Sequence, residues 1–337
     1  MGPADSPKPE DADEAASRRV EQAPAGGFVD VEFVVEPNYD GWRLDRYLCH
    51  KIRRLSRAKV QRIIERSLVS DRPLKASTLV RPGLKFVLRR RALDEPETPT
   101  ELPEVFRDDW LLVLDKPAGL PIHPTARYHK GTLVTLVRER YGEDYAYPVH
   151  RLDRETSGLL VCGRTAAVCA EMMRTFMRSD VRKEYLALCE GWPERDRFEV
   201  DAPIAEGTAF IRIAVRIDAE QGRPSLTRFE VLERFERDGA RFALVRAEPA
   251  TGRQHQIRIH LKVAGFPIVG DKMYGPDERY FDRFSRHELD EEAWRRLRLP
   301  RHALHAARIG FPHPETGAPV DFRAPLPPDL EMFRSGQ

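Results

Sequence analysis

Residues 148–163 combine a polar loop with a short buried strand. The polar half places one carboxylate, Asp153, between two guanidinium groups, Arg151 and Arg154. The second half, residues 159–162, is an apolar run bounded by glycines, which is typical of a buried strand entered from a loop. Nearby positive charge favours the ionised form of a carboxyl group, so we expect Asp153 to be ionised at the mouth of the strand. An ionised, positioned aspartate can act as a nucleophile, a base or an electrostatic stabiliser.

The alternative is that these three charged residues form only a surface ion-pair cluster, since structural ion pairs also perturb pKa values. The longer phrase favours chemistry. Residues 150–160 (His-Arg-Leu-Asp-Arg-Glu-Thr-Ser-Gly-Leu-Leu) closely resemble the catalytic motif of the RluA-type pseudouridine synthases. The resemblance implies that Asp153 is the catalytic residue and that Arg151 fills the gap left by a flipped nucleotide. A motif of about ten residues is far more specific than a short glycine-rich pattern.

Two further segments resemble the other motifs of this family. Residues 183–188 (Lys-Glu-Tyr-Leu-Ala-Leu) resemble its second motif, which implies that Tyr185 stacks on the target base. Residues 252–260 (Gly-Arg-Gln-His-Gln-Ile-Arg-Ile-His) resemble its third motif, which implies that Arg258 pairs with the catalytic aspartate. From the residues alone, a tyrosine on a strand is more often a core residue, and Arg258 belongs to a basic helix face that could meet phosphate.

Other segments extend the resemblance over residues 41–330. Residues 116–124 match the family's Lys-Pro-Ala-Gly-Leu and His-Pro motif, which implies a structural element that shapes the floor of the active site. Residues 270–275 and 301–306 resemble later family segments. Residues 276–299 are charged and predict a partly helical stretch; we assign them no role and interpret them as a peripheral insertion.

Charge is distributed unevenly along the chain, although the net charge is only +2. Residues 1–40 carry ten acidic and three basic residues, a net charge of −7. Residues 43–91 carry sixteen lysines and arginines against three acids, a net charge of +13. A block this basic indicates a phosphate-binding surface; the alternative is a solvated charged face. We favour a polyanionic partner, and we expect residues 1–27 to be a disordered acidic tail.

Residues 28–91 have the pattern of a small α/β module. Residues 28–36 alternate as a strand does, and apolar residues at helical spacing predict two helices between residues 44 and 68, with Ser56 as the N-cap of the second. The segment resembles the alpha-L RNA-binding domain, a type shared with a small-subunit ribosomal protein; the resemblance rests on residues 43–48 and 55–61 and on the turn at 81–83. It implies phosphate contacts, which position an RNA rather than specify it, from Arg43, Arg46, Arg57, Lys59 and Arg62.

One short segment departs from that domain. Residues 70–75 (Ser-Asp-Arg-Pro-Leu-Lys) replace the family's usual Val-Asn-Gly-Lys turn, which predicts an altered hairpin. Residues 92–103 are rich in proline and charge and predict a linker. The expected catalytic domain therefore spans residues 104–332. We expect it to be α+β, with a mixed, mostly antiparallel sheet flanked by helices.

Composition and spacing exclude several classes of protein. The cysteines at 49, 162, 169 and 189 lack Cys-x-x-Cys spacing, so we expect free thiols and no zinc site. The sequence has no P-loop or dinucleotide fingerprint, and we expect no metal or cofactor. No apolar run has the length of a membrane span and the first residues lack a signal-peptide core, so we expect a cytoplasmic protein. We also expect a monomer whose partner is RNA.

Uridine-to-pseudouridine conversion is an isomerisation, which needs a carboxylate near the sugar and a pocket that retains the detached uracil. The base must leave any stack to reach that pocket. Whether Asp153 attacks the anomeric carbon or removes a ribose proton is left open by the residues. A glycosidase is disfavoured, because such enzymes usually have two carboxylates flanking the bond and Glu155, beside Arg154, is a poor second one.

Three functional hypotheses follow. The first, which we favour because of the alpha-L segment, is a synthase acting on large-subunit ribosomal RNA. The second is the same enzyme acting on transfer RNA. The third is a catalytically idle RNA-binding or ribosome-assembly factor, against which the intact Asp153, Tyr185 and Arg258 argue.

Overall fold

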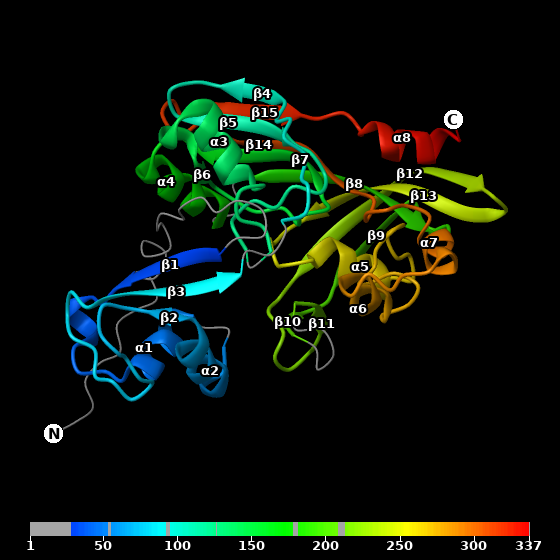
Figure 1. Ribbon diagram of the computed structural model, residues 1–337. Coiled ribbons are helices and arrows are strands. Elements are labelled where there is room, and N and C mark those ends of the chain that lie inside the picture. Colours follow the sequence, from blue (N-terminus) through cyan, green and yellow to red (C-terminus); the bar gives the residue numbers. More distant parts are fainter. Residues whose placement is uncertain are drawn as a thin grey trace. The chain divides into compact units, whose positions relative to one another are not determined.

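The computed structural model describes residues 28–52, 55–91, 95–125, 127–177, 181–207 and 213–336 (Figure 1). The expected acidic tail lies outside the described residues. The chain divides into two compact units, the N-terminal unit (residues 1–95) and the C-terminal unit (residues 96–337). Among the helices described, none is long and apolar enough to cross a membrane.

The N-terminal unit packs two helices against a small sheet. The sheet has the order β1-β3-β2 and is antiparallel. Ser56 occupies the N-cap position of α2 as expected, although its side chain makes no capping hydrogen bond. The apolar stripes of both helices are buried, with Leu44, Tyr47 and Val60 fully inaccessible. The elements are β1 (Phe28–Val34), a 3-10 helix (Pro37–Tyr39), α1 (Leu44–Lys51), α2 (Arg57–Ser67), β2 (Leu68–Val69) and β3 (Lys85–Arg91).

The C-terminal unit is built on a ten-stranded sheet of order β4-β5-β7-β14-β8-β13-β12-β9, with β15 paired to β14 and β6 to β7. All of its pairings are antiparallel except β7 with β14. The expected mixed, mostly antiparallel sheet flanked by helices is therefore confirmed. Its strands are β4 (Glu104–Arg107), β5 (Leu111–Lys116), β6 (Tyr147–Pro148), β7 (Ser157–Gly163), β8 (Arg182–Glu190), β9 (Arg197–Asp201), β12 (Leu226–Arg237), β13 (Ala240–Pro249), β14 (Leu304–Pro312) and β15 (Pro319–Arg323).

Helices cover both faces of this sheet. Successive side chains of a strand point to opposite faces, and the central strands are apolar at consecutive positions, so both faces are apolar. On β5, Leu112 and Leu114 pack with α3, whereas Leu111 and Val113 pack with α4 on the other face. A small separate sheet pairs β10 (Ile204–Glu206) with β11 (Val215–Ile217). The helices are α3 (Leu133–Tyr141), a 3-10 helix (Glu143–Tyr145), α4 (Ala166–Met177), α5 (Gln256–Val263), α6 (Tyr280–Ser285), α7 (Glu291–Leu297) and α8 (Pro328–Ser335).

Two local features position the rest. The dipeptide Asp238-Gly239 turns β12 into β13 with positive φ at both residues, as a tight hairpin requires, and the long hairpin is visible in Figure 1. Gly158 lets β7 lie beside β14, because a Cβ there would stand 2.3 Å from the carbonyl oxygen of Ala306. The loop that contains Asp153 leads directly into β7 and is held by that pairing.

Candidate active site

The three motif segments meet at one pocket of the C-terminal unit. Asp153 comes from the loop before β7, Tyr185 from β8 and Arg258 from α5, and all three line the pocket. The loop before β7 and α5, which follows β13, meet at this pocket, so Asp153 and Arg258 are hydrogen-bonded although they lie 105 positions apart in the sequence. Arg151, the fourth residue that the motifs single out, also lines this pocket and is exposed.

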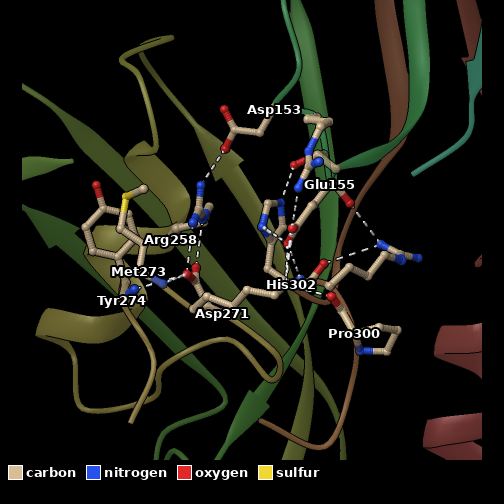
Figure 2. Close-up of polar contacts among 12 residues, drawn as sticks. Asp153, Glu155, Arg258, Asp271, Met273, Tyr274, Pro300 and His302 are labelled. Atoms are coloured by element: carbon tan, nitrogen blue, oxygen red, sulfur yellow. Dashed lines mark hydrogen bonds and ion pairs between the residues drawn. The ribbon is translucent and has the colours of Figure 1, made fainter. Parts of the chain in front are cut away.

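Arg258 lies between two carboxylates (Figure 2). Its Nη1 donates to Asp153 Oδ2 at 2.9 Å. Its Nε and Nη2 donate to Asp271 Oδ2 and Oδ1 at 2.7 and 2.9 Å. The side chains of Arg258 and Asp271 are 7% and 0% exposed, whereas that of Asp153 is 21% exposed. Asp153 is therefore the most exposed of these three side chains.

Asp153 is an ionised carboxylate. Burial raises its pKa, but His255, Arg258 and His302, which are all charged at the acidic pH where Asp153 titrates, together with the hydrogen bond from Arg258, lower that pKa to about 2. Burial lowers the pKa of His255 to about 4 and that of His302 to about 3. Both imidazoles are thus neutral at pH 7, and Arg258 is the cation that contacts Asp153 there.

This geometry corrects the expectation about the flanking arginines. The sequence placed Asp153 between Arg151 and Arg154, but Arg154 turns away: its Nη2 donates to Glu155 Oε1 at 3.0 Å and its Nη1 to the hydroxyl of Tyr128. Side chains of consecutive residues in an extended loop point in different directions. The guanidinium group of Arg154 therefore does not pair with Asp153, although the two residues are adjacent in the sequence. The partner of Asp153 comes from the third motif instead.

The Asp153 loop, residues 153–156, is anchored residue by residue. Lys116, fully buried, donates through Nζ to the carbonyl oxygen of Arg154 at 3.2 Å, and burial lowers the pKa of Lys116 to about 7. Thr156 Oγ1 shares a 2.7 Å hydrogen bond with Nε2 of His302. The carboxylate of Glu155 accepts from Lys272 at 3.0 and 3.1 Å. The loop is therefore tied to several different segments of the chain.

Tyr185 stands on β8 between two alanines, Ala306 of β14 and Ala247 of β13. These cross-strand neighbours are too small to cover its ring. Burial raises the pKa of Tyr185 to about 12, and the charge of Asp153 acts in the same direction, so the phenol is neutral. The arrangement offers a flat, uncharged ring at the pocket wall.

A histidine completes the surroundings of Asp153. His255 precedes α5 with a left-handed φ of 54°, and its Nε2 lies 3.6 Å from Asp153 Oδ1. Its Nδ1 lies 2.9 Å from the hydroxyl of Tyr274, which accepts from the backbone N–H of Val215 at 2.7 Å. If the hydroxyl donates to Nδ1, the neutral ring carries its proton on Nε2, facing Asp153.

Sequence reasoning missed Asp271, Lys272 and His302. Residues 270–275 and 301–306 only resemble family segments, an acid beside a base is ordinarily a solvated pair, and nothing in the sequence showed that all three side chains are buried. Among the described residues, no cluster of three or more His, Cys, Asp or Glu is placed to hold a metal.

In the N-terminal unit, the basic residues singled out from the sequence fall into three groups. Arg43 and Arg57 both donate to the buried carboxylate of Asp45, at 3.0 to 3.2 Å. Arg46 lies over the ring of Trp42, 4.5 Å from its centroid. Lys59 and Arg62 are exposed on α2. The first two cations are fixed in direction, and the last two extend into solvent.

Comparison with known proteins first defines the class of fold and site. A family model described as RNA pseudouridylate synthase matches residues 110–262, which include all three motifs. The solved structure of human RNA pseudouridylate synthase domain containing 1 aligns with 70% of this chain and 89% of its own, at a TM-score of 0.56 and 29% identity.

Similar sequences extend the match to nearly the whole chain. An uncharacterized RNA pseudouridine synthase of Chloroflexus aurantiacus is 38% identical over 89% of this chain and 91% of its own. Ribosomal large subunit pseudouridine synthase D of Zymomonas mobilis is 33% identical over 87% and 93%, and synthase C of Pasteurella multocida is 32% identical over 87% and 89%. The chain belongs to the RluA-type family of RNA pseudouridine synthases, and it is an isomerase whose substrate is RNA.

Proposed function

We propose that this protein isomerises specific uridines in large-subunit ribosomal RNA, with Asp153 as the catalytic carboxylate. One observation carries the assignment of Asp153: among the described residues that line the pocket, it is the only carboxylate. Glu155, the other candidate, is bound by Lys272 and Arg154 and does not line the pocket. Among the described residues at the pocket, a mechanism with two flanking carboxylates therefore lacks its second acid.

The roles of the surrounding residues follow from their contacts. Asp153 Oδ2 accepts from Arg258, which leaves Oδ1 as the oxygen that meets the sugar of the flipped nucleotide. Tyr185 packs on the uracil and retains it while it turns between detachment from nitrogen and reattachment through carbon. Holding the sugar and the uracil in a fixed orientation lowers the activation barrier of the isomerisation, because the reacting atoms are kept in place.

The rim of the pocket suits an RNA backbone. Arg151, Lys183 and Arg253 line the pocket. Among the described residues, none of these three cations has a carboxylate within ion-pair distance. In a protein whose arginines are mostly ion-paired, cations without a partner are the ones available to phosphates. In this proposal Arg151 also fills the space from which the target base has flipped.

The choice of RNA rests on two supports. Relatives that cover most of the chain are named for the large ribosomal subunit. The basic helices α1 and α2, which resemble the alpha-L domain, supply a surface for structured RNA. We place the enzyme in the cytoplasm, acting as a monomer without a cofactor.

A pseudouridine map tests the proposal. RNA from cells with the protein, without it, and with only its Asp153→Asn variant would be treated with carbodiimide and read as reverse-transcription stops. We expect stops in large-subunit ribosomal RNA to be lost in the second and third strains. Stops lost only from transfer RNA would replace the substrate.

The purified variant separates catalysis from binding. Asp153→Asn is nearly isosteric, so we expect it to abolish turnover while RNA affinity stays within about threefold, since phosphate contacts carry most of the affinity. Multiple turnover by the variant would refute the role of Asp153. No loss of stops in any strain, together with normal RNA binding, would instead support the idle RNA-binding factor.

A further inference from the structure

Two adjacent residues outside the pocket, Asp271 and Lys272, hold the Asp153 loop at two points. Asp271 acts on Asp153 through Arg258, and Lys272 binds Glu155 two residues further along the loop. Both side chains are almost fully buried, and neither lines the pocket. They cannot touch substrate there, so their influence on the reaction must pass through the groups that they hold.

Asp271 determines which nitrogen Arg258 offers to Asp153. Its two oxygens take Nε and Nη2, the edge of the guanidinium that forms a bidentate pair, which leaves Nη1 for Asp153. Asp271 is itself fixed, because Oδ1 also accepts from the backbone N–H groups of Met273 and Tyr274 at 2.9 and 3.0 Å. The backbone turn at 271–274 thus sets the position of the guanidinium.

Lys272 acts on the same loop from its other side. Its Nζ donates to both oxygens of Glu155 and, at 2.6 Å, to the carbonyl oxygen of Pro300. The ammonium lies 4.7 Å from the ring centroid of Phe284 on α6 and 5.8 Å from that of Trp294 on α7. Residues 276–299, which the sequence left without a role, thus supply two aromatic rings that cover this ion pair and keep it away from water.

We propose that Asp271 and Lys272 are positioning residues for the isomerisation and that residues 276–299 serve the same end by covering Lys272. The proposal rests on the assignment of Asp153 as the catalytic carboxylate. It goes beyond that assignment, because it attributes part of the rate to residues that make no contact with RNA. A rigid loop holds Asp153 where the sugar arrives, whereas a loop freed at either point samples other positions.

Asp271→Asn separates the two tasks of Asp271. The amide keeps an oxygen for the N–H groups of Met273 and Tyr274 but turns its NH2 toward Nε of Arg258, where two donors oppose each other. We expect kcat to fall about 100-fold, the effect of a misplacement of about 1 Å, while KM for RNA stays within twofold. A loss of packing alone would lower thermal stability and leave kcat of the folded fraction unchanged.

The chain contains a matched control. Asp108 accepts from two backbone N–H groups through Oδ1 and from His313 Nε2 through Oδ2, so Asp108→Asn makes the same kind of change away from the pocket. We expect this variant to lose less thermal stability, because the side chain of Asp108 is 25% exposed and that of Asp271 is fully buried, and to keep wild-type kcat. Equal kcat in the two variants would overturn the proposal for Asp271.

Lys272→Met is the second test, and it remains informative if Asp271→Asn does not fold. The methionine keeps the apolar stem between the rings and removes only the ammonium, so we expect a kcat loss of about tenfold with unchanged KM. Wild-type kcat in this variant would overturn the role of Lys272.

Comparison with Asp153→Asn keeps the two proposals apart. An inactive Asp153→Asn beside a fully active Asp271→Asn would refute positioning and leave the proposed catalytic role intact. Turnover by Asp153→Asn would refute both, since the loop would then position nothing that reacts.

Discussion

The N-terminal unit places one buried aspartate between two arginines. The carboxylate of Asp45 is inaccessible to solvent and accepts hydrogen bonds from Arg43, Arg57 and Gln61. The side chains of Arg43 and Arg57 are 43% and 60% exposed. The hydrogen bond from Arg43 leads the interactions that hold the pKa of Asp45 well below its usual range. One acid and two bases leave a positive charge, carried on the exposed side.

The C-terminal unit inverts this arrangement. Arg258 is the buried centre, Asp271 is its buried partner, and Asp153 is the partner that reaches the pocket. One base and two acids leave a negative charge, and it is carried by the exposed acid. In both clusters the buried residues fix the geometry, and the more exposed residues are accessible to RNA. A buried acid with two bases leaves exposed positive charge, whereas a buried base with two acids leaves exposed negative charge.

The comparison teaches that the same pair of residue types serves two tasks. Exposed arginines with fixed directions suit phosphates, whose contacts position an RNA. An exposed carboxylate kept ionised by a buried cation suits chemistry at a sugar. Removing the buried centre of each cluster should therefore damage a different step.

The largest effect is expected from Arg258→Met. It leaves Asp271 buried without its cation, and loss of one partner of a buried pair lowers the free energy of unfolding by about 3–5 kcal/mol. Turnover should fall at least as far as in Asp271→Asn, because Asp153 loses its contact altogether. Urea unfolding and single-turnover kinetics measure the two losses.

The pH dependence gives this prediction a sign. Without Arg258, burial raises the pKa of Asp153, so residual activity should be lost as the pH falls through a midpoint about 1–3 units higher than in the wild type. The unpaired carboxyl of Asp271 likewise gains a raised pKa, so the variant should lose stability as the pH rises, opposite to the effect of an ion-paired carboxylate. An unchanged acidic limb would contradict the contact between Arg258 and Asp153.

A matched arginine serves as the control. Arg308 also lies between two carboxylates, Asp321 and Glu184, but it does not line the pocket. Arg308→Met should lower stability to a smaller extent, because the side chains of Arg308 and Asp321 are 23% and 39% exposed, and it should leave the acidic limb of the rate in place.

A smaller effect is expected from Asp45→Asn. Freed from their carboxylate, Arg43 and Arg57 must be ordered by the RNA itself, at about 0.5–1.5 kcal/mol for each side chain. The lost negative charge favours RNA by less, because exposed charges are screened. Affinity should fall with kcat at saturating RNA unchanged. Asp30→Asn, which breaks the Asp30–Arg89 pair between β1 and β3, is the control and should bind normally.

Parts of this picture could be predicted from the sequence because they depend on neighbours in the chain. The apolar run between two glycines lies in β7, the alternating residues 28–36 contain β1, and the helical spacing between residues 44 and 68 gives α1 and α2. The sheet class was also predicted correctly. Each of these features follows from a local pattern that the backbone itself imposes.

The remainder depends on distant pairings that no local pattern encodes. Ser157 and His305 are 148 residues apart and become hydrogen-bonded through the parallel contact of β7 with β14. Asp271 and Lys272 form a charged dipeptide, which predicts a surface turn, and only the three-dimensional fold buries both. Asp271 and Lys272, which we propose position the Asp153 loop, are therefore the residues whose role was hardest to predict from the sequence around them.

The smallest effect is expected from a cation of the N-terminal unit that has no carboxylate within ion-pair distance among the described residues. Lys59 is exposed on α2, so Lys59→Gln should remove about one phosphate contact and lower the slope of log affinity against log salt by about 0.7–0.9. Turnover at saturating RNA should be unchanged. Arg197→Gln, which removes an exposed arginine paired with Glu230 in the C-terminal unit, should leave the slope unaltered. Equal slopes in wild type and Lys59→Gln would show that Lys59 does not meet phosphate and leave the fixed pair, Arg43 and Arg57, as the cations of the N-terminal unit proposed to do so.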